Sequence, residues 1–237
     1  MKNALLASLV MVAFSLNALA QQGAFVYNKL LPDHSVESKI NKRSHKLYLS
    51  LPRGYWAKDS LLYPVLYYLD GALLYYTFHG TRIALDLNSD IEKVIIVGID
   101  SGVTDLKSWF DNRHIDYSPS YSKKWDLKYK TATKSGGASK FLAVLKNEII
   151  PFVDEHYKSS DNRGLAGHSL AGLFTTYCLI KEPELFNRYG INSPSLSFQD
   201  EEVLKMEKSF SEQNSKLYAK VFASVGSLDD GVDMEKI

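Results

Sequence analysis

The sequence predicts an α/β fold with a mostly parallel central sheet and helices on both faces. Two segments of strand length, residues 63–69 and 93–99, are almost continuously apolar. Such runs are typical of strands that helices cover on both faces. A helical stretch at about 75–87 separates them, and strands continue to alternate with helices along the rest of the chain. This alternation favours parallel strands joined by helical crossovers.

The other elements follow in chain order. Residues 25–27 and 46–51 are strand candidates, and we expect them to be antiparallel strands at the edge of the sheet. Apolar residues spaced three and four apart predict a helix over 138–157, which Pro151 is expected to kink without interrupting its apolar stripe. Later strands are expected from about 163 to 168, at 188–191 and at 216–225, and later helices at 170–180 and 201–210.

Residues 100–137 interrupt this alternation. They show neither a strand nor a helix period, and they contain many aromatic and charged side chains. Long connections without regular structure are usually functional or mobile, and the aromatic content argues against a disordered linker. We predict a lid-like insertion that overhangs a pocket, with Trp109 among the residues that bind a substrate.

The N-terminus predicts export to the periplasm or secretion. Residues 1–20 combine a basic start, a short apolar run and an Ala-x-Ala site, which together indicate a secretory signal peptide cleaved after Ala20. The apolar run is broken by polar residues and is shorter than the roughly 20 residues that span a bilayer. We therefore expect one domain, residues 21–237, with no membrane span after cleavage.

The composition is that of an ordinary globular domain. Hydrophobic residues make up 45% of the chain, and 28 Lys and Arg balance 27 Asp and Glu. This balance gives no indication of a nucleic-acid partner. The single cysteine, Cys178, lies in an apolar segment and is expected in the core. We predict neither a cofactor nor a metal ion, and the sequence does not indicate an oligomeric state.

Residues 163–172, Arg-Gly-Leu-Ala-Gly-His-Ser-Leu-Ala-Gly, carry the clearest chemical signal. A short apolar run leads into this segment and a helix-forming stretch follows it, which is the strand–turn–helix setting of a nucleophile elbow. The tight turn requires tiny side chains two residues before and after the serine, and Gly167 and Ala171 satisfy this. We predict Ser169 as the nucleophile, although such a pattern taken alone also occurs by chance.

A serine nucleophile needs a base, a group that orients the base, and N–H donors for the developing oxyanion. The N–H of Leu170, at the start of the following helix, is the predicted first donor. The second is predicted to be Gly71 or Ala72, because they follow an earlier central strand. An ordinary strand-end turn explains Asp70-Gly71-Ala72 equally well.

The acid and the base are harder to find in the chain. In this arrangement the acid and then the histidine follow the serine, so Asp229 or Asp230, after the last predicted strand, is the predicted acid. All six histidines precede these aspartates, and His114 is the only one we consider as a stand-in base. We expect the natural protein to continue for roughly one further strand and helix that carry the base. On this interpretation the fold lacks its C-terminal strand and helix.

Several segments in the right order resemble one family. Residues 63–71, Tyr-Pro-Val-Leu-Tyr-Tyr-Leu-Asp-Gly, are similar to a Tyr-Pro-Val-x-Tyr-x-Leu-Asp-Gly strand of the putative esterase family of α/β hydrolases. This family includes enterobactin-type siderophore esterases, feruloyl and acetyl esterases, S-formylglutathione hydrolases of the esterase D type, and mycolyltransferases. The elbow and residues 113–119, 136–142 and 193–196 also resemble its motifs. The resemblance implies an α/β-hydrolase fold over about 63–230, with Ser169 as nucleophile.

The resemblance also bears on the other site residues. It favours Asp229 over Asp230 as the acid, and it implies that Arg113 faces an anionic or catechol group of a substrate. An ion pair between Arg113 and Asp116 that holds the lid is the alternative. Two features depart from the family: Ala171 replaces the usual glycine, and the C-terminal histidine is absent.

We therefore predict an exported serine esterase that hydrolyses carboxylic esters through an acyl-enzyme on Ser169. Siderophore or aromatic acyl esters are the candidate substrates, so the expected partner is a small-molecule ester. Acyl transfer to an alcohol is the rival reaction. A non-catalytic binding protein of the same fold is the rival class, because the histidine is absent from the chain.

Overall fold

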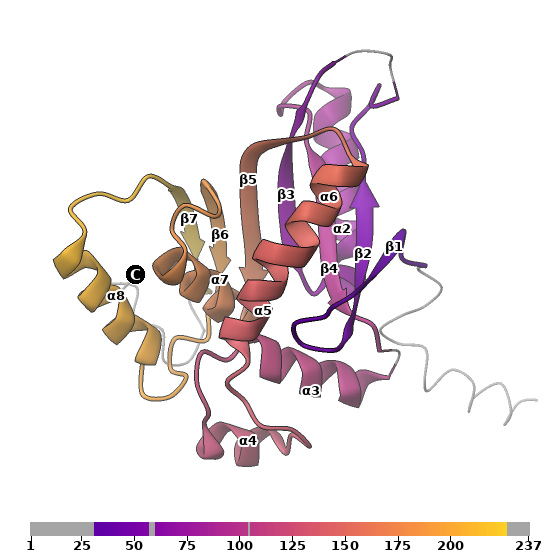
Figure 1. Ribbon diagram of the computed structural model, residues 1–237. Coiled ribbons are helices and arrows are strands. Elements are labelled where there is room, and N and C mark those ends of the chain that lie inside the picture. Colours follow the sequence, from indigo (N-terminus) through magenta and orange to yellow (C-terminus); the bar gives the residue numbers. More distant parts are fainter. Residues whose placement is uncertain (1–30, 57–59, 104, 227–237) are drawn as a thin grey trace, which may run out of the picture.

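The computed structural model describes residues 31–56, 60–103 and 105–226 (Figure 1). The predicted signal peptide, the predicted strand at 25–27, and the candidate acids Asp229 and Asp230 lie outside these residues. Among the helices that the structure describes, none has the length and hydropathy needed to cross a membrane.

A seven-stranded mixed sheet forms the centre of the described part, in the order β1-β2-β4-β3-β5-β6-β7. β2 runs antiparallel to β1 and β4, and every other pair of neighbours is parallel. The prediction of a mostly parallel sheet with an antiparallel edge is confirmed. The strands are β1 (His34–Glu37), β2 (Ser44–Ser50), β3 (Tyr63–Leu69), β4 (Ile95–Ser101), β5 (Ser159–His168), β6 (Arg188–Asn192) and β7 (Lys220–Ser224).

The strand order reverses at β3. The chain passes from β3 to β4 on one side and later returns to β5 on the other side. Ligands of open α/β sheets bind outside the carboxyl ends of the strands at such a reversal. Asp70 follows β3, Asp100 lies near the end of β4, and Ser169 follows β5. The fold therefore brings these three residues to the same end of the sheet.

Helices pack on both faces of the sheet (Figure 1). β3 is apolar throughout because its successive side chains point to opposite faces of the sheet and both faces are covered. Tyr67 belongs to the main core under α5 and α7, whereas Tyr68 faces α2 and stacks on Phe78 at 4.2 Å between ring centres. The helices are α2 (Gly71–Leu87), α3 (Leu106–Tyr117), α4 (Lys123–Tyr129), α5 (Ala138–Val144), α6 (Ile150–His156), α7 (Leu170–Lys181) and α8 (Glu202–Gln213).

The helix predicted over 138–157 is continuous but not uniform. A π-helical turn, Leu145–Ile149, joins α5 to α6, whose second residue is Pro151. Proline has no N–H, and its ring clashes with the carbonyl four residues earlier, so a wider turn accommodates it. The predicted apolar stripe survives, because Phe141, Leu145, Ile149 and Val153 are all buried.

The expectation of an irregular connection over 100–137 was wrong, because α3 and α4 occupy much of it. α3 was not predicted because the side chains on its buried face are partly polar. Its buried residues include His114 and Asp116 together with Trp109 and Tyr117, so polar side chains interrupt the apolar period. A charged or polar residue inside a helix face hides that helix from any analysis of hydrophobic periodicity.

Candidate active site

Ser169 occupies a sharp turn between β5 and α7. Its backbone has φ 59° and ψ −119°, a left-handed conformation that a non-glycine residue adopts only when its surroundings hold it there. The N–H of Ser169 donates to the carbonyl of Asn192 at 3.0 Å, and the N–H of Ser195 donates to the carbonyl of Ser169 at 3.1 Å. The end of β6 and the turn after it therefore hold the serine in this conformation.

Gly167 is required by the close approach of α7. A Cβ at this position would lie 2.3 Å from the carbonyl oxygen of Ala171 and 2.6 Å from Oγ1 of Thr175. The prediction that the position two residues before the serine needs a tiny side chain is confirmed. Ala171 is fully buried, so its methyl group fits where a glycine is usual. The next residue, Gly172, is also closely packed, though less tightly than Gly167, with Asn192 O 2.9 Å from its Cβ position; the sequence pattern did not indicate this.

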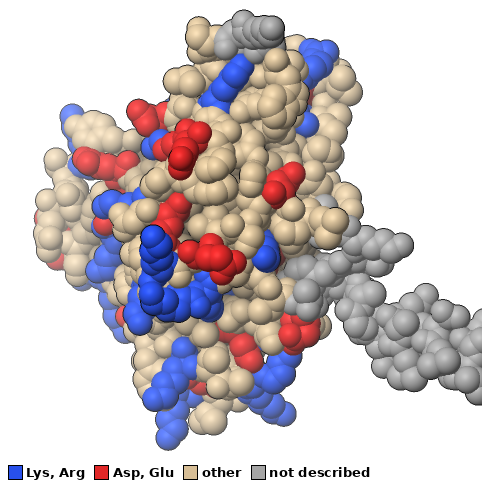
Figure 2. All heavy atoms as spheres, turned by 45° about the vertical axis from the view of Figure 1, so that its right-hand side comes forward, with Lys and Arg blue, Asp and Glu red and all other residues tan. Residues whose placement is uncertain are grey.

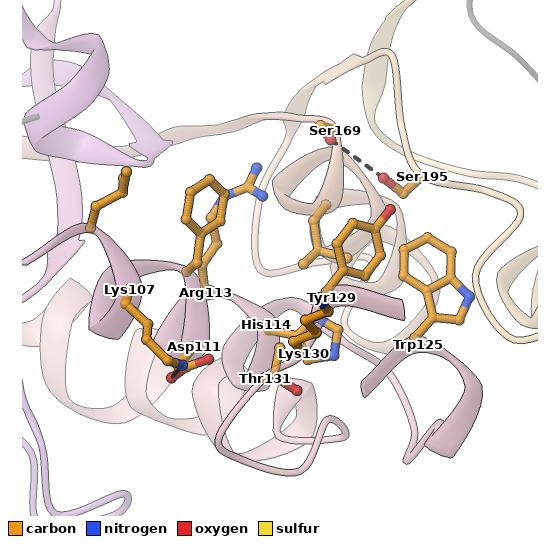
Figure 3. Close-up of a pocket in the computed structure, with 13 residues that line it drawn as sticks. Lys107, Asp111, Arg113, His114, Trp125, Tyr129, Lys130, Thr131, Ser169 and Ser195 are labelled. Atoms are coloured by element: carbon orange, nitrogen blue, oxygen red, sulfur yellow. Dashed lines mark hydrogen bonds and ion pairs between the residues drawn. The ribbon is translucent and has the colours of Figure 1, made fainter. Parts of the chain in front are cut away.

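The Ser169 hydroxyl contacts a second hydroxyl. Oγ of Ser169 lies 3.4 Å from Oγ of Ser195. Figure 3 marks this contact with a dashed line. Across the described residues no imidazole is hydrogen-bonded to Ser169. His114 instead bonds Oδ1 of Asp126 at 2.9 Å through Nε2 and links α3 to α4, so this nitrogen is engaged by a partner other than Ser169.

The candidate oxyanion donors lie at the starts of two helices. Leu170 is the first residue of α7, and Gly71 and Ala72 are the first two of α2. The N–H of Ala72 donates to Oδ2 of Asp100 at 2.9 Å. Ala72 therefore has an acceptor already, and it can serve an oxyanion only by leaving Asp100.

Asp100 is a buried carboxyl that no pattern in the sequence indicated. Its Oδ1 accepts a 3.0 Å hydrogen bond from the indole N–H of Trp109. The pKa of Asp100 is raised to about 7, mainly by burial, against the lowering effect of the Ala72 hydrogen bond; the nearby Asp70 adds to the rise. The carboxyl is therefore close to its titration point at neutral pH.

Replacing Asp100 with asparagine is expected to change how stability depends on pH. The folded-state pKa of about 7 lies above the ordinary value of 3.8, so between these values the folded protein keeps a proton that the unfolded chain has released. Wild type should therefore lose stability relative to Asp100→Asn as the pH rises from 5 to 7, by about 1 kcal/mol per pH unit. Urea unfolding of both proteins at pH 5, 6, 7 and 8 measures this, and a difference that stays constant with pH would contradict it.

Arg113 makes an ion pair different from the one expected. Its Nε donates to Oδ1 and Oδ2 of Asp70 at 2.8 and 3.0 Å, and its Nη2 donates to the carbonyl of His168 at 3.0 Å. The alternative ion pair with Asp116 was wrong, because Asp116 pairs with Arg43. Arg113 also lines the cavity beside Ser169, so a contact with a substrate stays a prediction.

Trp109 lies beside the cavity rather than on its wall. Its side chain is buried, and the cavity wall includes the following residue, Phe110, instead. A helix places neighbouring residues on different sides, and the helix itself was not predicted. A contact between Trp109 and a substrate stays a prediction, and Phe110 is the neighbouring aromatic residue that lines the wall.

Ser169 opens into a cavity of about 720 Å³ between the elbow, α3 and α4 (Figure 3). Aromatic side chains from both helices line it, and lysines lie at its edge. Most of the exposed wall surface is apolar, as in most small-molecule sites, although charged and hydroxyl side chains are also among the lining residues. Its lining residues are Leu106, Lys107, Phe110, Asp111, Arg113, His114, Trp125, Tyr129, Lys130, Thr131, Ser169, Leu170 and Ser195. Within the described ranges no three His, Cys, Asp or Glu side chains are grouped to hold a metal ion.

The reversal of strand order, the strained serine and the two helix starts are the arrangement found in the α/β-hydrolase class of proteins. Residues 38–231 match the family described as "Putative esterase", and the chain belongs to this family.

The chain is similar to three proteins in particular. It is 26% identical over 182 residues to ferri-bacillibactin esterase BesA of Bacillus subtilis, covering 74% of this chain and 62% of BesA. The crystal structure of the BES protein from Bacillus cereus matches with a TM-score of 0.70 and 29% identity, over 85% of this chain and 77% of that one. An IroE-like serine hydrolase from Shewanella oneidensis matches with a TM-score of 0.68 and 26% identity, over 84% and 62%. The chain thus spans less than two thirds of the length of BesA and of the Shewanella protein.

Proposed function

We propose that this protein is a serine esterase that hydrolyses aromatic, anionic carboxylic esters of the siderophore type. The observation that carries the proposal is the strained Ser169, which opens into a cavity with aromatic walls. The similarity to BesA, whose name describes it as a ferri-bacillibactin esterase, supports the choice of substrate class.

In the proposed reaction, Oγ of Ser169 attacks the ester carbonyl and a base takes its proton. The N–H of Leu170 and that of Gly71 or Ala72 donate to the oxyanion. Loss of the alcohol leaves an acyl-enzyme on Ser169, which water then hydrolyses. Asp229 is the proposed acid that orients the base.

The preference for an anionic aromatic ester rests on the cavity. Phe110, Trp125 and Tyr129 offer aromatic faces on which planar acyl groups stack. The segment 123–134, which contains α4, has five lysines and one aspartate, and it lies at the bottom of the molecule, where Figure 2 shows basic side chains gathered. A cationic edge raises the local concentration of anionic substrates.

Location in the periplasm or secretion is part of the proposal and rests on residues 1–20 alone. N-terminal sequencing of the protein purified from its natural source tests it. A mature chain that begins at Gln21 supports export, and a chain that begins at Met1 counts against it.

Ester cleavage in the presence and absence of an alcohol acceptor tests the reaction. The substrates are a catechol-containing benzoyl-serine ester and a neutral acetyl ester, given to the protein expressed from its natural gene. Release of free acid, faster for the catechol ester, supports hydrolysis. Formation of a new ester in preference to the acid indicates acyl transfer, and binding without cleavage indicates a non-catalytic protein.

Truncating Phe110 is expected to weaken the binding of aromatic esters. The side chain is 52% exposed in the cavity wall, so Phe110→Ala removes a stacking surface without emptying the core. The loss of one aromatic contact, about 1 kcal/mol, should raise KM roughly fivefold and leave kcat nearly unchanged. Phe222→Ala is the matched control, because Phe222 is 67% exposed on β7 and outside the cavity wall. Equal KM values for the two variants would count against the cavity as the substrate site.

A further inference from the structure

Arg113 joins the two segments that carry the proposed oxyanion donors. Its Nε holds the carboxylate of Asp70, the residue before Gly71 and Ala72. Its Nη2 holds the carbonyl of His168, which lies two residues before Leu170. One guanidinium therefore ties the turn after β3 to the turn after β5, although about a hundred residues separate them in sequence.

The guanidinium is itself held in place. Its carbon lies 5.4 Å from the centre of the Trp109 ring and 5.6 Å from that of Tyr117, and the Arg113 side chain is only 13% exposed. Trp109 is fixed by Asp100, which also accepts the N–H of Ala72. The turn after β3 is thus connected to α3 in two ways: Asp70 binds Arg113 directly, and Ala72 is linked to Trp109 through Asp100.

Both turns need such support. Asp70 and Ser169 each have φ 59°, a conformation that is unfavourable for residues other than glycine. An oxyanion hole works only when both donors stand 2.7–3.1 Å from the position of the oxyanion. A displacement of about 1 Å between the two segments lowers the rate about 100-fold. Contacts that fix the two turns relative to each other therefore affect the rate without touching the substrate.

We propose that Arg113 is a positioning residue that sets the distance between the two oxyanion donors. The proposal rests on the proposed esterase function. It differs from a role in substrate binding, because the hydrogen bonds of Nε and Nη2 are made to the protein itself.

Arg113→Lys is the sharpest variant for this proposal. Lysine keeps a positive charge beside the buried Asp70 but lacks the planar fork that reaches Asp70 and the His168 carbonyl together. We expect kcat to fall 10- to 100-fold and KM to stay within threefold. Arg43→Lys is the matched control, because Arg43 also pairs with a buried aspartate of α3, Asp116, while the hydrogen bonds of its guanidinium go to Asn112 and Asp116 and not to either turn. Its kcat should stay within twofold of wild type.

Hydrogen exchange of backbone amides tests the same contacts without any activity. In Arg113→Lys, the amides of residues 71–74 and of 169–173 should exchange at least tenfold faster than in wild type, and in Arg43→Lys they should not. Unchanged exchange in both segments would overturn the proposal, as would a raised KM with unchanged kcat. If the wild type cleaves no ester, the proposed function fails, and the exchange rates still decide whether Arg113 holds the two turns together.

Discussion

Ser169→Ala is expected to lower kcat/KM for ester hydrolysis on the order of 10⁶-fold, the loss seen when a serine protease loses its nucleophile. The reason is that no acyl-enzyme can form without the hydroxyl, whatever else the site retains. Alanine adopts the same backbone conformation about as well as serine, so the midpoint of thermal unfolding should stay within a few degrees of wild type. Initial rates with an activated aryl ester, together with the unfolding midpoint, measure both effects.

Ser195→Ala is the matched control for this variant. Ser195 carries the other hydroxyl at the elbow, at 3.4 Å from Oγ of Ser169, a distance at which hydrogen bonds are weak. Its removal should lower the rate less than tenfold. If Ser195→Ala abolished activity and Ser169→Ala did not, the nucleophile would be assigned to the wrong serine.

Gly167→Ala is expected to destabilise the fold by about 3 kcal/mol, the upper end for overpacked sites. The added methyl would meet the Ala171 carbonyl at 2.3 Å, and a backbone oxygen at the start of a buried helix cannot move aside as a flexible side chain can. Urea unfolding followed by circular dichroism measures the change. Expression in the insoluble fraction alone would agree with the prediction but would not give its size.

Gly80→Ala serves as the control for that substitution. Gly80 lies inside α2, and a Cβ there would meet nothing within 4 Å. Alanine is favoured over glycine in a helix by up to about 1 kcal/mol, so this variant should be as stable as wild type or slightly more stable. Equal destabilisation by both substitutions would show that the close approach at Gly167 does not limit stability.

Local patterns predicted the parts of the fold whose structure depends on neighbouring residues. Tyr63–Leu69 was predicted to the residue, because a strand buried on both faces is apolar throughout. The strand predicted at 93–99 lies at 95–101 in the structure. The apolar run stops at Ile99, but the two polar residues that follow, Asp100 and Ser101, also pair with β2 in the sheet. The four-residue strand His34–Glu37 was missed, because it is short and none of its residues is fully buried.

In the candidate site too, features set by neighbouring residues were predicted, and contacts between distant residues were not. Ser169 and Gly167 lie two residues apart in the chain, so their spacing alone identified the elbow. The partner of Arg113 lies 43 residues away in Asp70, and the sequence instead suggested Asp116, a neighbour on the same helix. Nothing in a local pattern distinguishes these carboxylates, because the folding of α3 against the ends of β3 and β5 decides which one Arg113 meets. Asp100 was missed for the same reason.

The reaction of the folded protein with a serine-directed fluorophosphonate tests the central claim most directly. The claim is that Ser169, and no other hydroxyl, is the nucleophile of an esterase site. Intact-mass measurement followed by peptide mapping should find one adduct, on the peptide that contains Ser169, and no adduct on Ser169→Ala or on the unfolded chain. An absent adduct on folded wild type, or an adduct on another residue that persists in Ser169→Ala, would contradict the claim.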